Sequence, residues 1–239
     1  MMPGHEKRVL SLDGLRGLAA LIVFLYHVDI MVKPFGAGGP SLFPGTASVM
    51  VFFILSGIVL SLVPFKHMGN GGYDWLGYYP RRVVRLCVPL FAAIALVLPV
   101  GYVAWRLGST SRSALAVAYD AGLPTAVHDI LMQFDVLFAA CLVVVVVAIA
   151  DGFTRRALSA APMVFLGKVS YSLYLTHAIV IGALAALLPR LGIVDPLAIA
   201  AVSLPASMLV SVAFWRIIEV PSMNLSRSLA SSGPRDAVR

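Results

Sequence analysis

The feature that most constrains this chain is its first apolar stretch, which is long enough to cross a membrane and yet carries three ionisable residues. The stretch covers residues 10–31, and Asp13, Arg16 and His27 lie within it. A helix needs about 20 apolar residues to span a bilayer. An Asp or Arg at mid-membrane disfavours insertion by about 2.5 kcal/mol or more, so such residues are functional candidates by default.

The spacing of these residues predicts a polar stripe on one helix face. Arg16 and His27 are eleven residues apart, which is three turns plus about 20° and about 16 Å along the axis. Asp13 joins the same stripe, and Gly17 and Ala20 beside it would allow another helix to approach closely. The alternative is that Asp13 and Arg16 form a snorkelling pair at the interface while His27 caps the far end.

The composition predicts an all-α, polytopic membrane helix bundle. Of the 239 residues, 60% are hydrophobic and 12% charged, against about 45–50% and 25% in soluble domains. We expect a single membrane domain over residues 1–239, with polar tails at 1–8 and 222–239, and an uncleaved first helix. The net charge of +7 does not indicate a nucleic-acid partner, because the basic residues are spread between the apolar runs.

The apolar runs predict about six transmembrane helices. They cover residues 10–31, 46–65, 83–105, 130–150, 163–188 and 196–218. With Arg16 and Arg216 set aside, twelve Lys and Arg residues fall on the side of the termini and four on the other side. The positive-inside rule therefore places both termini in the cytoplasm, and an even number of spans agrees. Cys87 and Cys141 are interpreted as buried thiols, and no metal site is predicted.

Three further groups of polar residues are candidate sites. Arg81, Arg82 and Arg85 lie at the cytoplasmic start of the third span, where they either bind phosphate or only anchor the topology. Tyr171, Ser172, Tyr174 and His177 lie in the fifth span. Tyr171, Tyr174 and His177 recur every three residues, so we expect them to line one side of this helix. The hydroxyls and the imidazole either bind a polar substrate, relay a proton or join helices. Glu219 precedes Pro221, and these two residues predict a helix stop at the cytoplasmic interface.

Five motifs in this order resemble the acyltransferase 3 family of bacterial integral-membrane acyltransferases. The first is Leu12-Asp-Gly-Leu-Arg16-Gly-Leu-Ala-Ala20 with His27, and the second is Phe52-Phe-Ile-Leu-Ser56-Gly57. The third is Arg81-Arg82-x-x-Arg85-x-x-x-Pro89. The fourth runs from Phe165 to His177, and the last is Glu219-x-Pro221.

The resemblance implies an enzyme that takes an acyl group, acetyl by default, from acyl-CoA and transfers it to a hydroxyl of a carbohydrate or cell-surface glycan. The expected partners are acyl-CoA, a carbohydrate or glycolipid acceptor and the bilayer of the cell membrane, with no bound cofactor. By the same resemblance His27 and Arg16 belong to the active centre, and the loop arginines hold the anionic CoA. The predicted substrate-binding residues are Arg81, Arg82, Arg85, Ser56, Tyr171, Ser172, Tyr174, His177 and Glu219.

The predicted mechanism is general base catalysis by His27 on the acceptor hydroxyl. Arg16 would contact CoA or stabilise developing negative charge, with Asp13 orienting it. Alternatively, His27 is itself acylated and passes the group on.

The chain also departs from the family pattern, since members usually have about ten helices. The shortfall lies between the third span and Phe165, so an inactive, shortened relative is one alternative. A small-solute transporter lined by Arg16, His27 and His177 is a second, and a bis-histidine haem protein is a third. Association between copies of the chain is left open by the sequence.

Overall fold

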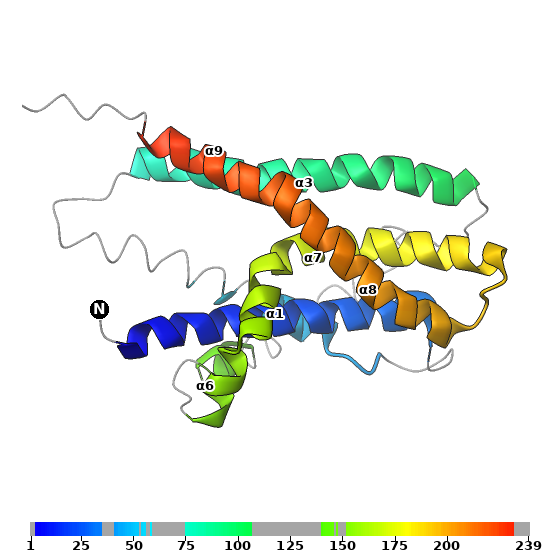
Figure 1. Cartoon of the computed structure of the whole chain (residues 1–239), viewed down its shortest axis with the longest axis horizontal. Coiled ribbons are helices and arrows are strands. Elements are labelled where there is room, and N and C mark those ends of the chain that lie inside the picture. The colour runs from blue at the N-terminus through cyan, green and yellow to red at the C-terminus, as the bar shows by residue number, and fades with distance from the viewer. Residues whose placement is uncertain are drawn as a thin grey trace, which may run out of the picture.

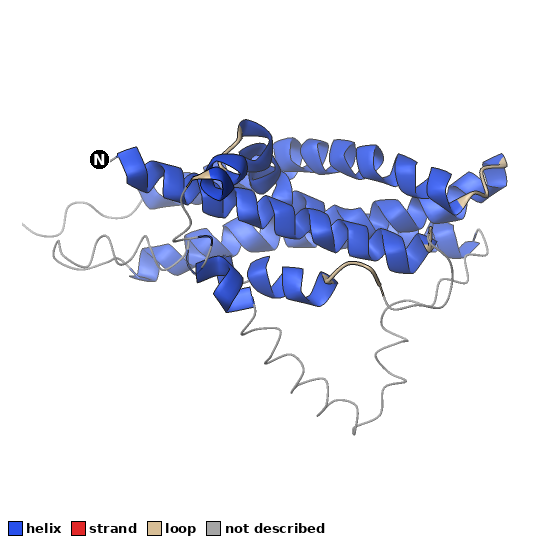
Figure 2. Ribbon diagram, turned by 90° about the horizontal axis from the view of Figure 1, so that it is seen from below, coloured by secondary structure: helices blue, strands red, loops and turns tan. Residues whose placement is uncertain are grey.

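The computed structural model describes residues 3–34, 41–52, 54–55, 58, 75–106, 140–145, 147 and 152–231. Within these ranges every regular element is a helix, which confirms the all-α prediction (Figure 2). The elements are α1 (Pro3–Val32), α3 (Trp75–Arg106), α6 (Phe153–Leu158), α7 (Ala161–Leu187), η1 (Leu188–Leu191), α8 (Pro196–Phe214), η2 (Trp215–Glu219) and α9 (Val220–Ser231).

Four described segments are long and apolar enough to cross a membrane, and they correspond to four of the six predicted spans. They are Leu10–Val32, Val83–Val100, Ala161–Leu191 and Pro196–Ser228. The predicted spans at 46–65 and 130–150 lie partly outside the described residues. The long helices run side by side along the longest axis, and α1 begins at the same end of the bundle at which α9 ends (Figure 1).

The close packing of α1 against α7 forms the centre of the bundle. A Cβ added at Gly17 would lie 2.5 Å from the backbone nitrogen of Gly167, so no larger residue fits at this crossing. Ala20 is buried in a cluster with Leu166 and Leu173 of α7. The prediction that Gly17 and Ala20 allow close helix approach is therefore confirmed.

A row of buried serines joins α8 to α7. Ser203, Ser207 and Ser211 are four residues apart along α8, and all three are fully buried. The Oγ of Ser211 lies 3.1 Å from Thr176 Oγ1 of α7. Small side chains at this spacing let helices approach closely in a membrane, where packing rather than water exclusion holds helices together.

The predicted helix stop at Glu219 and Pro221 is wrong, because the chain stays helical to Ser231. The last turn before the proline is the π-helical η2, in which the amide of Val220 donates to the carbonyl of Trp215. A proline lacks an amide hydrogen and its ring crowds the preceding turn of an α-helix. The wider π turn changes the register just before Pro221, so α9 follows without a break (Figure 1).

Helix α3 is the least covered of the long helices, and it begins at Trp75, earlier than the predicted span. It packs along α9 and α7, but many of its apolar side chains are exposed, including Phe91 and Leu98. These side chains are suited to contact with lipid. The two thiols are free, as expected, but only Cys87 is partly buried; Cys141 is exposed, contrary to the prediction, because it lies on the open side of its helical segment.

Candidate active site

Two groups of polar residues lie at different levels of the α1–α7 helix pair. Because α1 is one unbroken helix, the eleven residues between Arg16 and His27 correspond to about 16 Å along its axis. The partner residues on α7 are Gly167 and His177, ten residues or about 15 Å apart. Polar residues of α1 and α7 therefore meet at two positions along the helix pair, which we call its two levels. The first level is the arginine cluster (Asp13, Arg16, Gly167 and Ser170), and the second is the histidine pair (His27 and His177).

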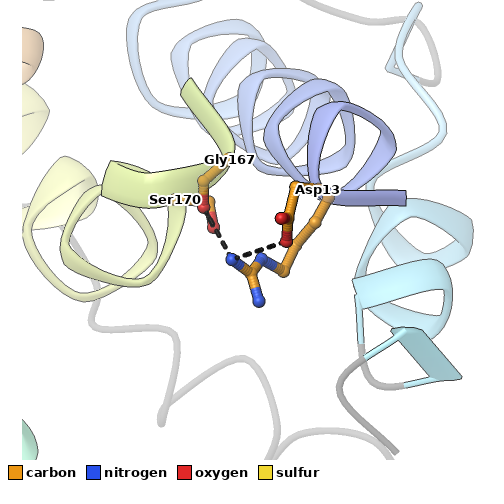
Figure 3. A network of polar contacts seen from close by, with 4 residues as sticks. Asp13, Gly167 and Ser170 are labelled. Carbon is orange, nitrogen blue, oxygen red and sulfur yellow. Dashed lines mark hydrogen bonds and ion pairs between the residues drawn. The ribbon is translucent and has the colours of Figure 1, made fainter. Parts of the chain in front are cut away.

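In the arginine cluster, a guanidinium group bridges α1 and α7. Arg16 Nη2 donates to the carbonyl of Gly167 at 2.9 Å and lies 3.4 Å from Asp13 Oδ1 (Figure 3). Ser170 Oγ donates to the same carbonyl at 2.8 Å. The Nε of Arg16 is buried and has no hydrogen bond to a described residue. The structure thus brings Asp13 and Arg16 together, as the sequence predicts.

The histidine pair joins the same two helices by a direct contact. His177 Nε2 lies 3.2 Å from His27 Nδ1, and the two rings meet edge to face with centroids 4.7 Å apart. Each Nδ1 also lies 2.9 Å from a carbonyl one turn earlier in its own helix, Val23 for His27 and Leu173 for His177. His177 is buried, whereas His27 is only partly buried.

Aromatic rings surround the histidine pair. Tyr26 meets the His27 ring edge to face with centroids 5.3 Å apart. Tyr174 lies tilted beside His177 at 6.1 Å and stacks on Phe52 at 5.6 Å. The predicted residues His27, His177 and Tyr174 are therefore brought together from α1 and α7.

Glu219 forms a third polar contact, between the end of η2 and α7. Its Oε2 accepts a hydrogen bond from Ser172 Oγ at 2.5 Å, and both side chains are buried. Arg85 of α3 and Arg16 both exert an attractive charge interaction on its carboxyl group. Because η2 is a π turn, it rotates Glu219 toward α7, and such turns occur often at functional sites.

Tyr171 does not join the other residues of its motif. Its hydroxyl donates to the carbonyl of Leu86 in α3 at 2.9 Å. Residues three apart on a helix are displaced by about 60°, so Tyr171 and His177 differ by about 120° in direction. The prediction that Tyr171, Tyr174 and His177 line one side is therefore wrong for Tyr171.

Several site residues fall outside what the structure describes, and others were missed by the sequence reasoning. Ser56 and the side chains of Arg81 and Arg82 lie outside the described part of the chain. Gly167 and Ser170 lie within the fourth motif but were not predicted as site residues, although a glycine inside a helix often indicates a close packing contact. Phe52 begins the second motif without being a predicted site residue, and Tyr26 carries no signal apart from being an aromatic residue in an apolar span.

The chemistry available to the two levels differs. The arginine cluster offers a fixed positive charge and donors, which suit phosphate or carbonyl oxygens. The histidine pair offers imidazoles, which can accept and return a proton near neutral pH.

The comparisons with known proteins support one family. The family model described as "Acyltransferase domain" matches residues 9–128, about half of the chain. This match includes Asp13, Arg16, His27 and the three loop arginines, whereas His177 and Glu219 lie beyond it. No curated protein and no solved structure matches the chain. On the match over half its length, the chain belongs to the acyltransferase 3 family of membrane acyltransferases.

Proposed function

We propose that this protein is a membrane O-acyltransferase that transfers an acyl group, most simply acetyl, from acyl-CoA to a hydroxyl group of a carbohydrate or cell-surface glycan. The observation that carries the proposal is the arrangement of Arg16 and His27 on one face of α1. A fixed cation and a proton acceptor lie about 16 Å apart, and both contact α7.

The separation favours one role for Arg16 over the other. Arg16 and His27 are about 16 Å apart along the axis of α1, and their side chains are held by different partners, Gly167 and His177. This arrangement argues against Arg16 stabilising negative charge on a carbonyl oxygen that reacts beside His27. In CoA a long pantetheine arm separates the thioester from the phosphates, so one donor molecule can extend from one level to the other. Arg16, oriented by Asp13, then binds the anionic part of CoA or its arm while the thioester lies near His27.

The chemical step balances with His27 as general base. The imidazole takes the proton of the acceptor hydroxyl while that oxygen forms a bond to the thioester carbonyl carbon. The C–S bond breaks, and the imidazolium returns the proton to the CoA sulfur. Alternatively, the His27 nitrogen is acylated first and the acceptor oxygen then takes the group from it.

The topology of the proposal follows from the loop charges. CoA is cytoplasmic, and the positive-inside rule places both termini, with the arginine cluster near them, at the cytoplasmic face of the cell membrane. The loop arginines Arg81, Arg82 and Arg85 would add positive charge for the CoA phosphates at this face. The acceptor would approach the level of the histidine pair, where Tyr174 is a candidate for contacting it.

The test uses membranes that contain the intact protein or its His27→Ala variant, supplied with acetyl-CoA labelled in the acetyl group. The label is followed into lipid-linked glycan, surface polysaccharide and the protein itself. We expect His27→Ala to reduce transfer by about 10²–10⁴-fold, the usual value of a general base, with normal protein levels. Ser203→Ala serves as the matched control, because among the described residues this buried hydroxyl bonds only to the Ile199 carbonyl of its own helix.

The other outcomes separate the alternative functions. Normal transfer by His27→Ala removes His27 from the mechanism. No transfer, with acetyl-CoA still bound, favours a shortened relative that only binds the donor. Substrate flux without any requirement for acyl-CoA favours a transporter.

A further inference from the structure

The contacts of the histidine pair determine where its protons lie. A backbone carbonyl can only accept a hydrogen bond, so the contact of His177 Nδ1 with the Leu173 carbonyl at 2.9 Å requires a proton on Nδ1. A neutral His177 then carries its lone pair on Nε2. This nitrogen is the one that faces His27 Nδ1 at 3.2 Å.

The proton of His27 follows from the same reasoning. Its Nδ1 faces two acceptors, the lone pair of His177 Nε2 and the Val23 carbonyl at 2.9 Å. An unprotonated Nδ1 would direct a lone pair at both of them, so Nδ1 carries the proton. The lone pair of a neutral His27 therefore lies on Nε2, which has no hydrogen bond to a described residue.

We propose that His177 is a positioning residue that accepts the Nδ1 proton of His27 and so presents Nε2 of His27 as the reacting nitrogen. This inference rests on the proposed acyl transfer and names the atom and the supporting residue that this transfer uses. His177 is 4% exposed, whereas His27 is only partly buried, so His27 is the more accessible of the two. His177 acts through His27 and does not itself meet the acceptor.

The pair also stabilises the charged intermediate of the reaction. When His27 Nε2 takes the acceptor proton, the ring becomes an imidazolium whose Nδ1–H still donates to His177 Nε2. A hydrogen bond from a charged donor is roughly twice as strong as a neutral one. The Val23 carbonyl alone is a poorer partner, because it also accepts the helical amide bond of its own turn.

The experiment combines nitrogen NMR with labelled acetyl transfer. The other three histidines of the chain are first replaced by Gln, and this background is checked for transfer. The two remaining imidazoles are labelled with ¹⁵N and measured at about pH 8, above the usual histidine pKa of about 6.5. His177→Leu removes the acceptor, whereas His177→Gln retains an amide oxygen near the position of Nε2.

We expect both imidazoles of the background protein to carry the proton on Nδ1, with an unprotonated Nε2. In His177→Leu, we expect the kcat for transfer to fall about 100-fold, in the range seen when a partner that orients a histidine is lost. Its KM for acetyl-CoA stays within about twofold, because the arginine cluster is unchanged. His177→Gln recovers transfer to within about fivefold of the background protein, since an amide oxygen also accepts a hydrogen bond.

The outcomes distinguish this inference from the proposed function. A proton on Nε2 of His27 or of His177 in the background protein overturns the inference, and this measurement does not depend on the folding of either His177 variant. Equal transfer by His177→Leu and the background protein also overturns it while leaving the acyltransferase proposal intact. Absence of transfer by the wild-type chain overturns both.

Discussion

The arginine cluster and the histidine pair join the same two helices by different means. Arg16 bridges α1 and α7 with a charged side chain that donates to a backbone carbonyl, at a crossing where Gly17 and Gly167 bring the backbones together. The histidine pair bridges the helices about three turns further along α1, through two rings that meet edge to face. Arg16 lies six residues from the start of the span Leu10–Val32 and His27 lies five residues from its end. The first level carries a permanent charge, whereas the second consists of groups that can be neutral. The comparison indicates that one level is suited to holding an anion and the other to moving a proton.

The largest effect is expected from Gly17→Leu, which disrupts the helix crossing on which both levels depend. The added side chain would start 2.5 Å from the backbone nitrogen of Gly167, and backbone cannot move aside as a flexible side chain does. We expect a destabilisation of about 3 kcal/mol or more, together with loss of acyl transfer. Thermal unfolding of the detergent-purified protein measures it.

Gly182→Ala is the control for this substitution, because the added carbon would meet only the flexible end of Met31, at 3.4 Å. We expect this variant to unfold within about 1 kcal/mol of the wild type. Equal unfolding temperatures for Gly17→Leu and Gly182→Ala would contradict the packing argument.

Arg16→Gln tests whether the arginine cluster holds the donor. This variant removes the charge while retaining a donor for the Gly167 carbonyl. We expect the KM for acetyl-CoA to rise about 10- to 100-fold, because a hydrogen bond to a charged group is worth about 1.5–3 kcal/mol. Steady-state kinetics in membranes measures this KM. For comparison, we expect His27→Gln to lower kcat instead.

Arg16→Lys sharpens the same test. Its ammonium can still approach Asp13, but it lacks the planar fork of a guanidinium. We expect a KM between those of the wild type and Arg16→Gln. A change in kcat alone in both Arg16 variants would place Arg16 at the reacting carbonyl and overturn the division of roles between the two levels.

Ser172→Ala tests the third contact, between α7 and η2. Glu219 loses the hydroxyl that donates to its buried carboxyl group, although the charges of Arg85 and Arg16 remain nearby. We expect a destabilisation of about 1–2 kcal/mol, measured by unfolding in mixed micelles. Ser203→Ala, which loses only a bond within its own helix, should change the free energy of unfolding by less. If the two serine variants are equally stable, the contact with Glu219 contributes no net stability.

The sequence was sufficient for features that depend on periodicity within one helix. The spacing of eleven positions from Arg16 to His27 predicts that they share a face of the helix. The small residues beside them predict a close helix contact, which the structure places at Gly167. The sequence did not predict which residues meet across helices, such as His27 with His177 or Ser172 with Glu219. These contacts depend on the rotation of α7 and on the π turn of η2, and neither leaves a periodic signal. The same limit explains why Pro221 predicts a helix end where the structure continues as a helix.

The smallest effect is expected from Tyr171→Phe, and it tests whether this tyrosine belongs to either level. Its hydroxyl donates to the Leu86 carbonyl of α3, away from the histidine pair. Hydrogen bonds between membrane helices average about 0.6 kcal/mol, so we expect a destabilisation of about that size. Transfer should fall less than in Tyr174→Phe, because Tyr174 lies beside His177. Both variants are measured under the same conditions. If Tyr171→Phe loses as much transfer as Tyr174→Phe or more, Tyr171 is a substrate-binding residue, as the sequence predicts. A smaller loss would show that Tyr171 does not belong to the site around the histidine pair.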